Sequence, residues 1–478
     1  MRPALLVLLL AGCAVGPDFH PPAAPPIDRY TPEPLPAESV AAETTGGAMQ
    51  RFVTDMDIPA QWWTLFGSPP LNSLVEQALK NNPNLQAAQA ALRVAEENYL
   101  AQRGAYFPSV QASLNPTRQK IANDVSSPLN SGASLFSLHT AQLSVAYSPD
   151  VFGGVRRTVE NAQALADAQR FEMEATYLTL TSNVVAAALQ EAALRAQVSA
   201  TEEIVKLLSE QVALMQKQLE LGAIAEATVI QQRVVLAQAQ ASLAPLQKQL
   251  AQQRNLLTAL AGAYPSNEVA QKFDFASLKL PVELPVSLPS KLVQQRPDVR
   301  AAEAELHAAS AEIGVATANM LPQFTINGDV GSVATTMASL FTSGTGFWTV
   351  SANIAQPIFQ GGTLLHRRRA AEAAYDQAAA QYRSTVIAAM QNVADSLRAL
   401  QHDAVALKAA LDAKVLAEDS LSIARRQLQL GDISYFALLT AEQAYFQTTL
   451  VLVQAQSNRY ADTAALFQAL GGGWWNRP

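Results

Sequence analysis

Two periodicities divide the chain into short alternating segments and long helical runs. The segment WTVSANIAQPIF places Trp348, Val350 and Ile354 on one side of an extended chain and small polar residues on the other. A period of two predicts strands with one apolar and one wet face. The three companion segments are PSVQASLNP, TAQLSVAYSP and PQFTINGDVGS. Strand is expected to meet helix at Pro108, Pro149, Pro322 and Pro357.

One large duplication organises the chain. The stretch NPNLQAAQAALRVAEENYL, from Asn82, matches RPDVRAAEAELHAASAEIG, from Arg296, and Pro108 then matches Pro322. Further on, SPDVFGG matches QPIFQGG, and QLELG matches QLQLG. Each half therefore predicts the same order of elements: a helix, two strands, a very long helix and a shorter helix. The prolines of LKLPVELPVSLPSK, between the halves, exclude a helix interior.

The long helical runs are expected at 154–221 and 362–430, and neither contains proline. At about 1.5 Å per residue, each would be a rod of roughly 100 Å. The two shorter helices of each half nearly match that length together, so we expect them to pair with the long helix as an antiparallel coiled coil. These shorter helices are expected at 84–106, 226–262, 298–320 and 434–470. The coiled-coil spacing of three and four residues is followed by Leu397, Leu400, Ala404, Leu407 and Leu411.

The first long helix carries two apolar stripes. One stripe is Leu207, Leu214 and Leu221, and polar residues separate it from the other. Two stripes favour a helix that is flanked on both sides, like a stave in a wall, whereas an ordinary bundle is the alternative. The second stripe consists of Ile204, Leu208, Val212, Met215 and Leu219.

The N-terminal segment MRPALLVLLLAGC predicts export. Its apolar run is shorter than the roughly 20 residues of a membrane-spanning helix and is typical of a secretory signal. The ending Leu-Ala-Gly-Cys resembles the bacterial lipobox, in which Cys13 becomes the lipidated, palmitate-bearing first residue of the mature protein. Ala14, rather than an aspartate, favours the outer membrane. An ordinary signal peptide with an unrelated cysteine is the alternative.

Composition narrows the function classes. The net charge of −7 and the pI of about 5.4 give no support for nucleic-acid binding. Cys13 is the sole cysteine, so no internal disulfide is expected. The histidines are scattered, and the chain holds no HExxH, G-x-S-x-G or phosphate-loop pattern. We therefore expect no catalytic residues, no metal and no cofactor, with a lipid-anchored enzyme as a minor alternative.

The alternating segments have the length of membrane strands. A tilted strand needs roughly 9–11 residues to cross a bilayer, and unpaired sheet edges are not tolerated in hydrocarbon. Four strands are too few for a barrel, whose smallest form has about eight, so several chains would have to share one. Three chains would supply twelve strands, with polar faces lining a pore; a small soluble sheet is the alternative. The expected pore-facing residues are Gln111, Ser113, Gln142, Ser144, Thr325, Asn327, Asp329, Thr349, Ser351 and Asn353.

Together these segments resemble the outer-membrane factors of tripartite efflux pumps, the TolC-like channels, and in particular their lipoprotein branch (NodT/OprM-like). The matching stretches include AGCAVGPDFHPP, WWTLFGSPPLNSLVEQALKNNPNLQAAQAAL, LPSKLVQQRPDVRAAEAEL, both LG turns and LGGGWW. The resemblance implies a mainly α fold with a small β part. It implies a homotrimer with a 12-stranded barrel in the outer membrane and a helical α-barrel in the periplasm.

The resemblance also implies partners and a function. A periplasmic adaptor (membrane fusion) protein and an inner-membrane pump of the RND type would dock beneath the channel, which would be a passive exit duct for small molecules. Selection of the cargo is then expected in the inner-membrane partner. A periplasmic coiled-coil scaffold lipoprotein without a pore is the alternative function.

In the family, the helix tips close the periplasmic entrance and dock the adaptor. On the chain alone, the glycines of the tips are explained as left-handed helix caps. Phe436 falls where relatives place an apolar constriction. Some relatives carry an aspartate where this chain has Thr440, which leaves Asp432 and Glu442 as candidates for an acidic ring. The tip residues are Gly222, Ala223, Ile224, Glu226, Gly431, Asp432, Ile433, Tyr435, Phe436, Thr440 and Glu442.

The basic run His366–Arg369 is expected near inner-leaflet headgroups, with a solvated face as the alternative. The expected organisation is a signal peptide (1–12), a lipidated arm (13–70), repeat one (71–262, strands about 109–118 and 138–148), a Pro-rich connector (263–290), repeat two (291–472, strands about 323–333 and 346–357) and a tail (473–478).

Overall fold

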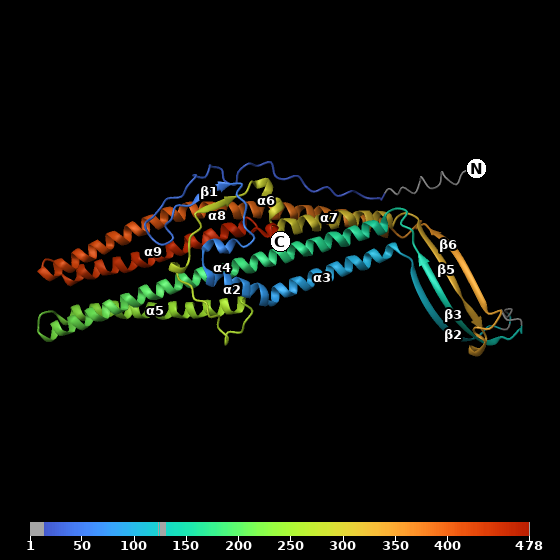
Figure 1. Cartoon of the computed structure of the whole chain (residues 1–478), viewed down its shortest axis with the longest axis horizontal. Helices are drawn as coiled ribbons and strands as arrows, with labels where there is room; N and C mark the ends of the chain where they lie inside the picture. The colour runs from blue at the N-terminus through green and yellow to red at the C-terminus, as the bar shows by residue number, and fades with distance from the viewer. Residues whose placement is uncertain (1–13, 123, 125–130, 478) are drawn as a thin grey trace. The chain divides into compact units, whose positions relative to one another are not determined.

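A computed structural model describes residues 14–122, 124 and 131–477 (Figure 1). The chain divides into two compact units. Unit 1 comprises residues up to 22, 92–169 and 302–382, and unit 2 comprises 23–91, 170–301 and 383–478. Long helices and a few strands make up the described chain, which confirms the expected mainly α fold with a small β part.

Unit 1 contains one antiparallel sheet. Its strands are β2 (Ser109–Lys120), β3 (Leu135–Tyr147), β5 (Gln323–Ala334) and β6 (Gly346–Ala355), in the order β2-β3-β5-β6. The central pairing of β3 with β5 joins the two hairpins, so the duplicated halves form a single sheet. Strands β2 and β6 are its edges, and each has one neighbour within the described chain.

Four helices connect to this sheet. Helices α3 (Pro83–Arg103) and α7 (Pro297–Ala318) precede β2 and β5. Helices α4 (Gly154–Glu220) and α8 (Thr363–Leu430) follow β3 and β6 and continue from unit 1 into unit 2. No described helix is both long enough and apolar enough to traverse a bilayer.

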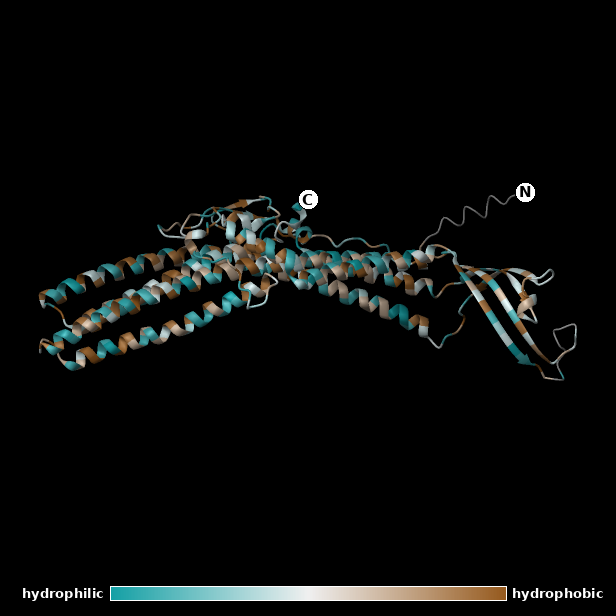
Figure 2. Ribbon diagram, turned by 60° about the horizontal axis from the view of Figure 1, so that its bottom comes forward, coloured by the Kyte–Doolittle hydropathy of each residue, from teal (hydrophilic) through white to brown (hydrophobic). Residues whose placement is uncertain are grey.

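In unit 2, α4 contacts α5 (Glu226–Leu260), and α8 packs against α9 (Tyr435–Ala469). The predicted seam on α8 is buried: Leu397, Leu400 and Leu407 are fully enclosed, and each contributes about 1.5–3 kcal/mol. Hydrophobic and hydrophilic residues are interleaved along the long helices (Figure 2). Polar residues therefore separate the apolar seams that hold the helices together.

The two stripes of α4 behave differently. Leu208 and Met215 are 1% exposed and belong to the helix contacts of the protomer. Leu207, Leu214 and Leu221 are exposed, with Leu214 at 58%. One stripe thus packs within the chain and the other is exposed.

The arm and the connector are more structured than the sequence suggested. Strand β1 (Arg51–Thr54) of the arm pairs in parallel with β4 (Glu283–Val286) of the connector, followed by α6 (Pro289–Gln295). Before α2 (Pro69–Asn81), Trp62 and Trp63 are buried, and Trp62 stacks on Phe467 with ring centroids 5.5 Å apart. Aromatic burial and the backbone pairing of two short strands thus draw residues 23–70 of the expected arm and the connector (263–290) into unit 2, whereas the start of the arm belongs to unit 1.

Candidate functional site

The sheet gathers the expected polar residues on one face. Directly opposite residues of an antiparallel ladder share a face. Gln111 lies opposite Ser144, Ser144 opposite Asp329, and Asp329 opposite Thr349, so one row crosses all four strands. The other expected residues of this face pair as Ser113 with Gln142, Asn327 with Ser351, and Thr325 with Asn353.

Hydrogen bonds link this face across the strands. The Ser144 hydroxyl donates to Oδ1 of Asp329 at 2.6 Å, and the Gln142 amide donates to the Ser144 hydroxyl at 3.1 Å. Asp329 is the only ionisable residue among the ten expected pore-facing residues. The face is therefore polar and wettable but nearly uncharged.

The opposite face of the sheet is apolar and exposed. Its central row contains Val110, Val145, Gly328 and Val350. Trp348 is 76% exposed and Val350 is 71% exposed. An apolar patch of this kind marks a surface that another molecule or a membrane covers.

The second candidate region is the pair of helix tips in unit 2. Gly222 (φ 74°) follows α4 and Gly431 (φ 79°) follows α8, both in the left-handed conformation. The next amides close each helix: Ala223 N–H donates to the Gln218 carbonyl at 2.8 Å, and Asp432 N–H donates to the Gln427 carbonyl at 2.9 Å. A Cβ on either glycine would meet nothing within 4 Å, so conformation alone favours glycine here.

A side chain that follows Gly431 connects the second tip to α4 by a hydrogen bond. The Tyr435 hydroxyl donates to Oε1 of Gln218 at 2.6 Å, while Phe436 is exposed and Ile433 packs on the α8–α9 seam. Thr440 donates its hydroxyl to the Phe436 carbonyl at 3.0 Å. At the first tip, Ala223 and Glu226 are exposed and Ile224 is half-buried. Asp432 is exposed as well.

Glu442 lies in the interior rather than on a ring-forming surface. Its side chain is enclosed by four helices, and the residue is 1% exposed. Gln232 of α5 donates to Oε2 at 3.4 Å, Arg425 of α8 stands 3.9 Å from Oε1, and Gln211 of α4, with its amide nitrogen turned toward the carboxylate, donates to Oε1 at 2.7 Å. Burial raises the pKa of Glu442, and its hydrogen bonds and Arg425 oppose that rise. Within one chain, therefore, Glu442 is enclosed whereas Asp432 is exposed.

Sequence reasoning missed the polar partners of Glu442. The only signal near Glu442 was its place directly after Ala441, a residue that packs with Leu438 between α8 and α9. A cavity of about 490 Å³ lies beside this cluster, and the exposed leucines Leu207 and Leu214 contribute to its lining.

Two further expectations concern attachment and metals. Cys13, the expected lipid attachment residue, lies outside the described residues. In the part of the chain that the structure describes, no three His, Cys, Asp or Glu side chains gather as metal ligands.

Known proteins resemble this chain over nearly its whole length. The family model described as "Outer membrane efflux protein" matches residues 74–263 and 288–472. The probable efflux pump outer membrane protein TtgC of Pseudomonas putida is 30% identical, over 99% of this chain and 95% of that protein. The cation efflux system protein CusC of Escherichia coli O6:H1 is 28% identical, over 99% and 98%.

A solved structure agrees with these relatives. The outer membrane protein VceC of Vibrio cholerae superposes with a TM-score of 0.82 at 27% identity, covering 87% of this chain and 100% of that chain. These relatives are efflux proteins rather than enzymes, and none supports a scaffold without a pore. The chain belongs to the outer membrane efflux protein family and is the outer-membrane channel component of a tripartite efflux system, which extends into the periplasm.

Proposed function

We propose that three copies of this chain close one twelve-stranded barrel, with the polar face of each sheet toward a water-filled lumen and the apolar face toward lipid. The observation that carries the proposal is the sheet itself, which has two free edges, an exposed apolar face and a polar face. Unpaired backbone groups at a sheet edge are costly in hydrocarbon, and closure between copies satisfies them.

The internal repeat specifies how the copies would join. In repeat one Val110 pairs with Val145, and in repeat two Phe324 pairs with Ile354 at the equivalent positions. The junction between repeats pairs Val145 with Gly328. Ile354 is the repeat-two equivalent of Val145, and Leu114 is the repeat-one equivalent of Gly328. If copies join as the repeats do, Ile354 of one copy pairs with Leu114 of the next.

This register places Asn353 of one copy opposite Asn115 of the next. The equivalent pair inside the protomer is Ser144 and Asp329, whose side chains approach to 2.6 Å. Cysteines at the two asparagines would thus lie within disulfide range, which requires Cβ atoms about 3.5–4.5 Å apart.

A crosslinking experiment tests the seam. The variant Asn353→Cys with Asn115→Cys should give a covalent trimer on oxidation in native outer membranes. The matched control, Asn353→Cys with Leu114→Cys, places the second thiol on the opposite face and should stay monomeric on a denaturing gel. Crosslinking of the control alone would refute the register. Purified trimer should also conduct ions across a planar bilayer, and a silent, monomeric protein would refute the pore.

The helix tips would form the periplasmic entrance. The exposed residues Leu221, Phe436 and Asp432, near the two capping glycines, suit a constriction that opens by helix movement. The Tyr435–Gln218 hydrogen bond would hold the second tip against α4 in the closed form. Gly222, Ala223, Ile224, Glu226, Gly431, Ile433 and Thr440 complete this proposed region.

The periplasmic adaptor would dock on the outer face of the same helices, above an inner-membrane pump of the RND type. The exposed stripe of Leu207, Leu214 and Leu221 and the adjoining 490 Å³ cavity offer an apolar groove to an adaptor helix hairpin. Charged substitution of Leu214 should weaken adaptor capture while the trimer stays intact, and loss of the trimer instead would assign this stripe to the contact between copies.

The cargo would be small molecules that pass without specific binding. One relative is named a cation efflux protein and another simply an efflux pump protein, and the proposed lumen face here carries a single ionisable residue, Asp329. Selection would then lie with the inner-membrane pump. Exchange of the pump beneath this channel should change the exported compounds, and an unchanged spectrum would contradict passive export.

We also propose that Cys13 is acylated. The support is the Leu-Ala-Gly-Cys sequence at the end of the signal segment. Mass spectrometry of the N-terminal peptide tests this directly: the expected species begins at Cys13 and carries acyl groups, and a free N-terminus at another residue would contradict it.

A further inference from the structure

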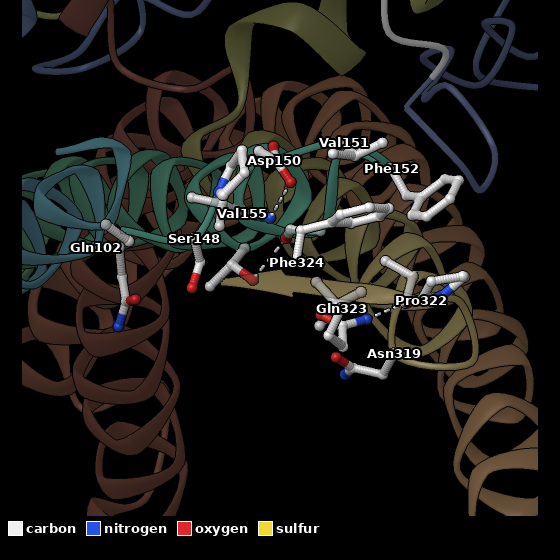
Figure 3. Close-up of a pocket in the computed structure, with 16 residues that line it drawn as sticks. Gln102, Ser148, Asp150, Val151, Phe152, Val155, Asn319, Pro322, Gln323 and Phe324 are labelled. Carbon is white, nitrogen blue, oxygen red and sulfur yellow. Dashed lines mark hydrogen bonds between the residues drawn. The ribbon is translucent and has the colours of Figure 1, made fainter. Parts of the chain in front are cut away.

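Unit 1 contains a pocket of about 220 Å³ where β3 runs into α4 and α7 runs into β5 (Figure 3). Phe152 and Phe324 form an apolar wall, with ring centroids 6.3 Å apart, and Val155 adds to it. Asp150 also borders the pocket, but its carboxylate accepts hydrogen bonds from the amides of Val155 and Arg156 at 2.9 and 2.8 Å. Its charge is thus used in capping α4.

The other polar side chains that line the pocket are uncharged. Figure 3 shows Gln102 and Asn319 on opposite sides of the pocket. Both side chains are exposed, and the described chain offers neither amide a hydrogen-bond partner. Thr158 and Ser148 also line the pocket. The site therefore combines an apolar wall with amide donors.

The start of the described chain lies against the loop between β3 and α4, and Phe152 of this loop lines the pocket. Val15 N–H donates to the Phe152 carbonyl at 3.0 Å. Ala14 touches Gly153, whose backbone has φ 77°, and a Cβ there would stand only 2.6 Å from Ala14. Cys13 is covalently joined to Ala14, so a lipid on Cys13 would be attached one residue before the contact with Gly153.

A clamp centred on Arg157 holds this segment in place. The guanidinium, whose residue is 3% exposed, donates to the Val15 carbonyl at 3.2 Å and to Asp18 at 2.6 Å. It also donates to Glu160 at 2.7 Å. Gly16 lies so close to Gly314 that a Cβ on Gly16 would be 2.4 Å from its backbone. Such contacts fix the segment more firmly than a flexible tether needs.

We infer that this pocket receives the glyceryl-ester part and the first methylenes of the lipid attached to Cys13; the inference rests on the acylation proposed above. The apolar wall of Phe152 and Phe324 suits methylenes, and the amides of Gln102 and Asn319 suit ester carbonyls. The remaining acyl chains leave the pocket for the bilayer.

Thiol protection in the full-length protein tests the inference. Thr158→Cys places a reporter in the pocket, and Ser148→Cys is a second reporter in case the first variant does not assemble. Each is compared in the lipidated protein and in Cys13→Ala protein exported through a cleavable signal peptide. Gln360→Cys, at the exposed position that matches Phe152 in repeat two, is the control reporter. Maleimide labelling is followed in outer membranes.

The pocket thiol should react more than about tenfold more slowly in lipidated protein than in Cys13→Ala protein, because access limits thiol reactivity, while the control thiol should react alike in both. Equal rates at Thr158→Cys, with acylation of Cys13 confirmed by peptide mass, would overturn the inference. Protection that persists in Cys13→Ala protein would assign the pocket to a free phospholipid and would also overturn it. A peptide mass without acyl groups would instead refute the acylation proposal, which distinguishes the two failures.

Discussion

The proposed orientation of the sheet in the membrane makes Val350 a sensitive position. Val350 lies mid-strand on β6, opposite Gly328, and its side chain is on the exposed apolar face. An arginine at the midplane of the lipid-facing surface of a barrel costs about 2–4 kcal/mol. Because a trimer contains three copies of the substitution, Val350→Arg should destabilise the assembly by about 6–12 kcal/mol. That range lies within the roughly 5–15 kcal/mol stability of a typical folded protein, so most of the trimer should be lost.

The matched control is Ser351→Arg. Ser351 is one residue further along the same strand, pairs with Asn327, and belongs to the polar face. Its substitution should leave the trimer intact, since the guanidinium stays in water. The assay is the fraction of heat-resistant trimer on a denaturing gel, with guanidinium unfolding in lipid vesicles as the second measurement. Equal loss of trimer in both variants, or an unaffected Val350→Arg protein, would refute the assigned faces.

Three further predictions concern the helical part. Tyr435→Phe removes the hydrogen bond to Gln218, which is worth about 0.5–1.5 kcal/mol, and should raise single-channel conductance. Gln218→Ala should have the same effect, and the double variant should conduct no better than either single variant. Additive effects on conductance would contradict a role for this hydrogen bond. Burial raises the pKa of Glu442, so the carboxylate form is disfavoured in the folded protein. As pH rises above about 4.3, the melting temperature of the native protein should therefore fall relative to that of Glu442→Gln. A difference in melting temperature between the two proteins that does not change with pH would contradict this. Burial and then the neighbouring Asp462 raise the pKa of Asp403 to about 7. Asp403→Asn should therefore stabilise the protein by an amount that grows from pH 4 to pH 8. Calorimetry that shows no gain in melting temperature at pH 8 would refute this prediction.

The sequence predicted the elements with strong periodicity. The alternation of Trp348, Val350 and Ile354 with small polar residues identified β6, and the register then placed the expected polar residues on one face. The leucines of the α8 seam likewise pack where their spacing indicated. Such patterns repeat over many residues, so a single interruption does not hide them.

Contacts between short segments that are far apart in the sequence could not be predicted from the sequence. Strands β1 and β4 have four residues each, too few for an alternation, and β4 contains Pro285. Arg157 meets Asp18 across 139 positions, and nothing local marks either residue as one of a pair. The burial of Glu442 depends on three other helices, so its exposure in a ring could not be judged from its own neighbours.

The two free edges of the sheet have a genetic consequence. In the proposed barrel each copy offers β2 to one neighbour and β6 to the other, so one defective edge would leave a gap in any ring that includes it. In a cell that expresses normal and edge-defective alleles equally, only about one trimer in eight would contain normal copies alone. An edge-defective allele should therefore be dominant and sensitise the cell to exported toxins even when a normal gene is present.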